Sequence, residues 1–151
     1  MLRNCSPEEA YFHFIDNDVF EFLVAETNRY AKQKIDSQQL SRSSRLTKWK
    51  ETNIPDMKRF CGIIMLMGLV KIPNLACYWS KVSSSMSRNW YEILLRLFHA
   101  SNNETRLEGD RLRKVQPLLD LIVPIFKDTI YPQEEICIDE TIISFRGHLS
   151  F

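Results

Sequence analysis

The chain has 151 residues, of which 44% are hydrophobic and 26% are charged, and its net charge is +1. This length and composition are typical of one globular domain and exclude a largely disordered protein. The near-neutral charge excludes a uniformly basic chain, but residues 29–50 hold seven Lys or Arg against the single acid Asp36. That stretch is therefore a candidate basic patch.

The cysteines and the apolar runs indicate a soluble intracellular protein. The four cysteines form no CxxC pair and have no His at zinc-ligand spacing, which argues against a disulfide framework or a zinc site. The longest apolar run, Phe60 to Val70, has eleven residues, and a membrane span needs roughly 20. The N-terminus is acidic and lacks an apolar segment, which argues against a signal peptide. We therefore expect no membrane partner.

The first half of the chain predicts two helices separated by a long loop. A cap at Asp16 or at the next residue predicts a helix to about Tyr30. Residues 31–53 are basic and rich in Ser and Gln, which predicts a long loop, in part disordered. A cap at Asn53, or at the residue before it, begins a second helix that is apolar on nearly every side and is expected deep in the core. Its buried stripe is expected at Phe60, Ile63, Ile64 and Met67.

The second half predicts two more helices and then a change to the two-residue period of strands. Residues 86–99 and 111–129 both show helical spacing of apolar residues, and Pro124 is expected to kink the later helix. The inward side chains are expected to be Trp90, Ile93, Leu94, Leu97 and Phe98 in the first of these helices, and Val115, Leu118, Leu119, Ile122 and Phe126 in the second. Short strands are expected near Ile136–Ile138 and Ile142–Phe145. The predicted fold is mainly α, with three to five helices followed by a β-hairpin that begins an incomplete α/β domain.

Asp139 is the candidate metal ligand. It follows an apolar strand-like run, and an acid at the end of a buried strand can hold Mg²⁺ together with substrate phosphates. Phosphodiester chemistry with two metals needs several such acids. The alternative is that Asp139 and Glu140 only mark the end of the strand and a turn.

Two groups of basic residues are candidates for contacts with DNA phosphates. The first is Arg42, Arg45, Lys48 and Lys50, next to the ring of Trp49. The second is Arg111, Arg113 and Lys114, which Glu108 and Asp110 partly offset. For both groups the alternative is an ordinary solvated surface. Tyr78, Trp79 and Trp90 are expected in the core, although stacking on bases is the other use of such rings. We expect His99 to lie at a helix end and His13 to pack among aromatic rings.

Five segments in order resemble the transposase domain of the piggyBac family. They are TNRYAKQ (27–33), MLMGLVKIPNLACYWS (65–80), MSRNWYEILLRLFHASNN (86–103), DRLRKVQPLLDLI (110–122) and IDETIISFRGHLSF (138–151). The resemblance implies that residues 1–130 correspond to the helical dimerisation and DNA-binding region. It also implies that residues 131–151 are the first strands of an RNase H-like catalytic domain, with Asp139 as its first catalytic Asp and a metal ligand.

The same resemblance implies an activity, a cofactor and a partner. Family members cut and paste DNA at TTAA sites with a divalent metal, Mg²⁺ or Mn²⁺, and act on double-stranded transposon ends in the nucleus. It also implies that the chain can form a homodimer. Three positions depart from the family pattern: Thr141 stands where Gln is common, Ser144 where Pro is common and His148 where Arg is common.

The second and third catalytic Asp of the family have no counterpart in these residues. We therefore expect a truncated, transposable element-derived chain that lacks catalysis and retains DNA binding or self-association. The alternatives are a non-catalytic interaction module and a non-functional remnant.

Overall fold

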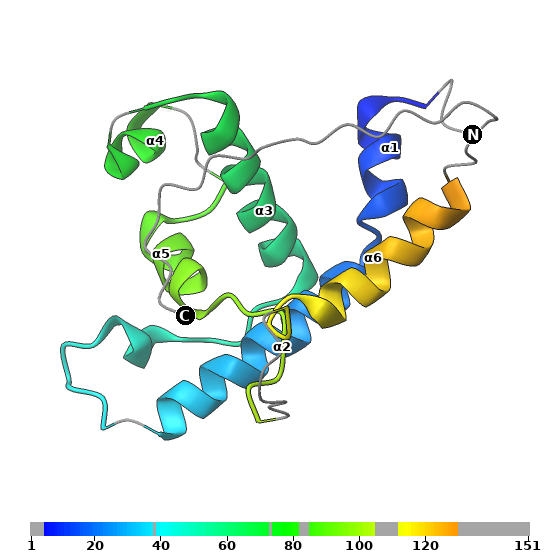
Figure 1. The fold of residues 1–151 in the computed structure, drawn as a ribbon. Coiled ribbons are helices and arrows are strands. Elements are labelled where there is room, and N and C mark those ends of the chain that lie inside the picture. Colours follow the sequence, from blue (N-terminus) through cyan, green and yellow to red (C-terminus); the bar gives the residue numbers. More distant parts are fainter. Residues whose placement is uncertain (1–4, 38, 73, 82–84, 105–111, 130–151) are drawn as a thin grey trace.

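The computed structural model describes residues 5–37, 39–72, 74–81, 85–104 and 112–129 (Figure 1). These ranges contain six α-helices and a short 3₁₀ helix, and no strand. The elements are α1 (Pro7–Phe14), α2 (Asn17–Asp36), η1 (Arg45–Lys48), α3 (Ile54–Leu69), α4 (Leu75–Lys81), α5 (Arg88–Leu97) and α6 (Gln116–Thr129). A mainly helical chain is thus confirmed, although six α-helices exceed the predicted three to five. The predicted hairpin within residues 131–151 lies outside the described residues, and so does Asp139.

Polar caps explain where the main helices begin. The Oδ1 atoms of Asp16 and Asn53 and the Oγ of Ser87 accept hydrogen bonds from backbone N–H groups in the first turns of α2, α3 and α5. Each cap satisfies a donor that the helix itself leaves unpaired. The caps predicted at Asp16 and Asn53 are confirmed.

Helix α1 was not predicted, although its start is readable in the sequence. Ser6 Oγ accepts from the Glu9 amide at 3.2 Å, while Glu9 Oε2 accepts from the Ser6 amide at 2.7 Å. This reciprocal pair is a capping box, and Pro7 occupies the first turn. Hydrogen bonds from Ser6 hold the pKa of the Glu9 carboxylate below its ordinary value, and the bond from the Ser6 backbone amide has the larger effect.

The core forms where α2, α3 and α5 meet. The main cluster consists of buried side chains of these three helices and of Met86, which lies outside them. Its members are Val19, Phe20, Leu23, Met57, Phe60, Ile63, Met86, Tyr91 and Leu94. A second, smaller cluster consists of Ala31, Leu46, Ile93 and Leu97. Helix α6 lies against α2 and α1 (Figure 1), and Phe126 stacks on Phe14 with ring centroids 4.8 Å apart.

Three predictions about the helices were wrong. Helix α2 does not end near Tyr30 but continues to Asp36, because Ala31 is buried in the second cluster. Helix α3 is not buried on every side: Leu69 is 83% exposed and Ile64 42%, since only one face packs against the core. Helix α6 begins at Gln116 and not near residue 111.

Several side chains predicted to point inward are exposed. On and before α6, Leu118 and Ile122 pack against the main cluster. Their predicted companions are at least 37% exposed, namely Val115, Leu119 and Phe126. In α5 the predicted stripe holds at Ile93, Leu94 and Leu97, while Phe98, just beyond the helix, is exposed. Pro124 lies inside α6, and the kink stays a prediction.

Candidate nucleic-acid interface

The basic segment, residues 39–50, is anchored to the helical core. Leu46, in the middle of η1, is only 4% exposed and packs in the second cluster with Ala31, Ile93 and Leu97. Trp49 is half-buried and touches both clusters. The prediction of a long loop over residues 31–53 therefore needs correction, because two apolar side chains within this polar stretch fix it to α2 and α5.

Polar contacts fix both ends of this anchored region. Ser44 caps η1 by accepting a hydrogen bond from the Leu46 amide at 3.3 Å. After η1, Asn28 of α2 donates to the carbonyl of Thr52 at 3.1 Å and accepts from its amide at 2.9 Å. The residues between these contacts therefore have a defined position relative to α2.

The four basic residues predicted in this segment differ in their surroundings. Arg45 forms an ion pair with Glu92 of α5, and Lys50 lies over the Trp90 ring with its Nζ 5.1 Å from the ring centre. Arg42 and Lys48 are exposed, and neither pairs with an acid in the part of the chain that the structure describes. These two cations are therefore the ones most available to an external anion.

Glu92 neutralises part of the charge in this region. Its carboxylate accepts from Arg88 Nε at 2.6 Å and also pairs with Arg45. The hydrogen bond from Arg88, more than that from Arg45, lowers the pKa of Glu92 below its ordinary value. Glu92 therefore stays ionised at neutral pH and is already engaged by two arginines.

A cavity of about 240 Å³ opens beside η1. It is lined by Tyr30 and Lys34 of α2, Leu46 of η1, and Arg96 and Leu97 of α5. We call it the basic cavity, because both of its charged lining residues are cations. Lys34 and Arg96 were not among the predicted site residues. The sequence contains both, but only the packing of α5 against α2 brings them together.

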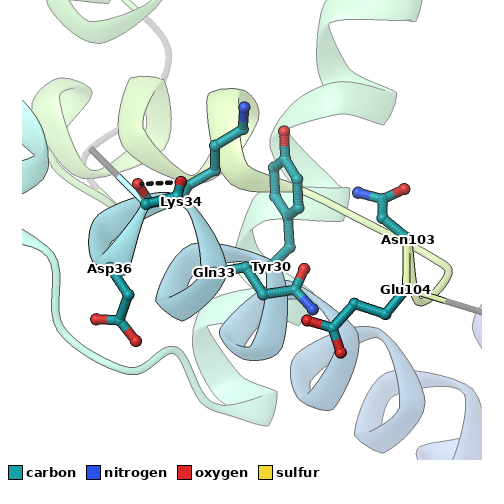
Figure 2. A pocket seen from close by; sticks show the side chains of 7 residues that line it. Tyr30, Gln33, Lys34, Asp36, Asn103 and Glu104 are labelled. Carbon is teal, nitrogen blue, oxygen red and sulfur yellow. Dashed lines mark hydrogen bonds between the residues drawn. The ribbon is translucent and has the colours of Figure 1, made fainter.

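A second cavity of about 630 Å³ shares Tyr30 and Lys34 with the first but has mixed charge. Its lining includes the acids Asp36 and Glu104. Figure 2 shows that Lys34 and Asp36 point to opposite sides of α2, as residues two apart on a helix must. Asp36, one of the two acids of this polar cavity, thus points away from the Lys34 side chain.

The second predicted basic group lies before α6. Arg111 lies outside the described residues, and Arg113 and Lys114 are in a turn preceding Gln116. Lys114 is exposed and Arg113 half-buried. The structure brings neither of them into the lining of the basic cavity.

The aromatic residues and histidines have mainly structural contacts. Tyr78 is buried, and the Trp79 indole donates to the Met86 carbonyl at 2.6 Å. The Trp90 indole donates to Asp56 at 3.1 Å. These contacts confirm the predicted core positions. His99 stacks on Tyr30 with ring centroids 4.0 Å apart just after α5.

The metal prediction cannot be placed on the described part of the structure, because Asp139 lies outside it. The described residues contain no group of three or more His, Cys, Asp or Glu side chains that could hold a metal ion. The His13 ring is instead engaged in a structural contact, because its Nε2 shares a hydrogen bond with the Thr129 hydroxyl at 2.7 Å.

Comparison with known proteins places the chain in a family. The piggyBac-type family described as "Transposase IS4" matches residues 6–151, which is nearly the whole sequence. The chain belongs to this transposase family. The resemblance seen in the five sequence segments is thereby confirmed, and the anchored basic segment lies within the matched region.

Human proteins are among the relatives of this piggyBac-type chain. It is 26% identical to PiggyBac transposable element-derived protein 2 over 97% of its own length and 24% of that protein. The identity is 25% to PiggyBac transposable element-derived protein 3, over 94% of the chain and 23% of that protein. It is also 25% to PiggyBac transposable element-derived protein 5, over 95% of the chain and 28% of that protein.

The chain spans about a quarter of the length of these relatives. No solved structure matches it. Among the described residues, none of the helices has the length and apolar character needed to cross a membrane.

Proposed function

We propose that this piggyBac-type transposase chain binds double-stranded DNA through the basic segment. The observation that carries the proposal is the position of Arg42 and Lys48. Both are exposed cations on a segment that Leu46 and Trp49 anchor to the core. Fixed cations lose less conformational entropy on binding than cations on a free linker do.

Contacts with phosphates explain what such a surface contributes. Lys and Arg that neutralise DNA phosphates release counterions, so that affinity falls as salt rises, whatever the base sequence. Phosphate contacts position a protein on the duplex but do not read its sequence. We therefore propose that the basic segment provides affinity and orientation, and that the TTAA preference of the family depends on other contacts.

Catalysis is a separate proposal and rests on Asp139. In the family this residue corresponds to a metal ligand, and bound Mg²⁺ or Mn²⁺ would activate the attacking oxygen and stabilise the leaving one. One carboxylate does not make a two-metal site, so we expect the 151 residues alone to bind duplex DNA without cleaving it. The nucleus is the compartment that fits this function.

The test is a salt titration of duplex binding, measured by fluorescence anisotropy with a labelled oligonucleotide. We expect the logarithm of the binding constant to fall linearly with the logarithm of the salt concentration. The double variant Arg42→Gln/Lys48→Gln should reduce the magnitude of the slope by about 0.9 for each phosphate contact removed. A duplex with TTAA and one with the same composition but without it should bind equally to both proteins.

The matched control is Lys127→Gln, which removes an exposed cation from the last turn of α6. This variant should keep the slope of the unmodified chain. A slope near zero for the unmodified chain would sink the proposal, and so would equal losses in Lys127→Gln and in the double variant.

Self-association is the second candidate function, favoured by one observation on α6. Leu119, Val123 and Phe126 are each at least 37% exposed and lie four and three residues apart, on one side of the helix. Exposed apolar surface of this kind marks sites of protein association. The homodimer implied by the family resemblance would be built from such a surface.

A further inference from the structure

We propose that the basic cavity holds one phosphate group of the DNA backbone and thereby sets the position of the duplex on α2, η1 and α5. This inference rests on the proposed DNA binding, and it assigns to Lys34 and Arg96 the role of phosphate ligands. It concerns a fixed contact at a defined place, in addition to the contacts made by the exposed cations of the basic segment.

The walls of the cavity are held in place by the core. Leu46 and Leu97 are 4% and 1% exposed and pack together in the second cluster. The Tyr30 ring is stacked on His99 with an angle of only 7° between the ring planes. Three of the five lining residues therefore have fixed positions before any ligand arrives, which is the condition for a preorganised site.

Neither cation forms an ion pair with an acid in the part of the chain that the structure describes. Glu92 lies four residues before Arg96 and could pair with it along α5. Its carboxylate, however, is engaged by Arg88 and Arg45. Lys34 lies over the Tyr30 ring, with its Nζ 5.7 Å from the ring centre, and a ring without net charge does not neutralise the ammonium group.

The neighbouring acids also leave the basic cavity cationic. Asp36 lines only the polar cavity and points to the side of α2 opposite to Lys34 (Figure 2). Glu104 likewise lines only the polar cavity. An anion that approaches beside η1 would therefore meet Lys34 and Arg96 without facing a lining carboxylate.

The size of the cavity favours a phosphate group over a larger ligand. Its volume of about 240 Å³ is below the range of roughly 300–1,000 Å³ that pockets for small organic molecules occupy. It corresponds to about eight water molecules at roughly 30 Å³ each, which leaves room for a phosphate and its bound water. Arg and Lys are the side chains that bind phosphate, Arg through its planar fork and Lys as a point charge.

The position of the cavity favours a phosphodiester in a duplex over a free anion. Leu46, which lines it, belongs to the same short helix as Lys48. A phosphate held between Lys34 and Arg96 would therefore lie beside the exposed cations of the basic segment, which can contact further phosphates of the same backbone. A free phosphate ion could use only the cavity itself.

The experiment compares duplex binding by the unmodified chain, Lys34→Gln, Arg96→Gln, the double variant and Arg96→Lys. Each Gln variant should reduce the magnitude of the salt slope by about 0.9. A slope difference of about 0.9 changes the binding constant about eightfold for each tenfold change in salt concentration. At 0.1 M salt, one decade below 1 M, each Gln variant should therefore bind about eightfold more weakly than the unmodified chain. Arg96→Lys keeps the charge and should retain the slope. Lys127→Gln serves again as the control, and the thermal midpoint of every variant shows that it is folded.

A second measurement separates a duplex phosphate from a free one. Inorganic phosphate is titrated while the Arg96 Nε–H resonance is followed by NMR, and the duplex is then titrated in the same way. We expect the duplex to shift this resonance at a far lower concentration than inorganic phosphate does. A response to inorganic phosphate without a response to the duplex would overturn the inference.

The outcomes distinguish the inference from the function on which it rests. If the chain binds the duplex with a salt slope that Lys34→Gln and Arg96→Gln leave unchanged, the cavity is not a phosphate site and the proposed DNA binding still stands. If the unmodified chain shows no salt-dependent binding, the proposed function and the inference both fail.

Discussion

Thr52 has a buried hydroxyl whose Oγ1 lacks a hydrogen-bond partner among the described residues. The residue is 4% exposed, and an unpaired buried hydroxyl costs about 1–3 kcal/mol. Thr52→Val keeps the shape and removes the polar atom, so we expect the free energy of unfolding to rise by about 1 kcal/mol. Urea denaturation followed by circular dichroism measures the change.

Thr27 provides the matched control for this prediction. It is fully buried, but its hydroxyl donates to the His99 carbonyl and accepts from the His99 amide, both at 3.4 Å. Thr27→Val should therefore lower the free energy of unfolding by about 1 kcal/mol. A loss of stability in Thr52→Val similar to that in Thr27→Val would contradict the assignment of Thr52 as unpaired.

Single residues also show how far sequence reasoning reaches. The basic character of residues 42–50 is visible in the sequence, and the two cations that remain exposed and unpaired among the described residues, Arg42 and Lys48, were in the predicted set. The engagement of Arg45 by Glu92 could not be predicted, because the two residues are 47 positions apart. The same holds for Lys34 and Arg96, which only tertiary packing brings to one cavity.

At the scale of elements, η1 links the core to the proposed interface. Leu46→Ala removes the buried anchor of η1, and such truncations cost about 2–5 kcal/mol of stability. We also expect weaker duplex binding with an unchanged salt slope, because the cations remain but must be ordered on binding. Urea denaturation and the salt titration measure the two effects.

Leu69→Ala is the control for the anchor, because Leu69 near the end of α3 is 83% exposed. This substitution should change stability by less than about 0.5 kcal/mol and leave duplex binding as it is. If Leu46→Ala retains full affinity while it loses stability, the fixed position of η1 does not contribute to binding.

The elements that the sequence predicted best are those with caps and a clear apolar stripe. The start of α2 at Asn17 and of α3 at Ile54 followed from local chemistry. The extension of α2 to Asp36 and the presence of η1 depend on Ala31 and Leu46, single apolar residues whose burial is decided by α5. The burial of α3 was overestimated because composition alone does not say how many neighbours a helix has.

At the scale of the whole molecule, the apolar side chains left exposed on α3 and α6 form the largest difference from the prediction. Leu69 near the end of α3 is 83% exposed and Met65, one turn earlier, 49%. On α6 the exposed residues Leu119, Val123 and Phe126 follow one side of the helix. Such surfaces are unusual on a chain that remains a monomer in water.

We therefore expect the 151-residue chain to self-associate as its concentration rises, with α6 as the contact surface. Sedimentation velocity should show a weight-average sedimentation coefficient that increases with concentration. Leu119→Glu places a charge in the exposed stripe and should keep the chain monomeric over the same range. Asp128→Asn changes an exposed residue on the opposite side of the same helix, nine positions from Leu119, and should associate like the unmodified chain. A coefficient that does not vary with concentration in the unmodified chain would rule out this association. Equal behaviour of Leu119→Glu and the unmodified chain would show that the contact surface is not on α6.

Because the basic segment and α6 are separate elements, a Leu119→Glu monomer that keeps the salt slope of duplex binding would show that DNA binding does not require the second copy.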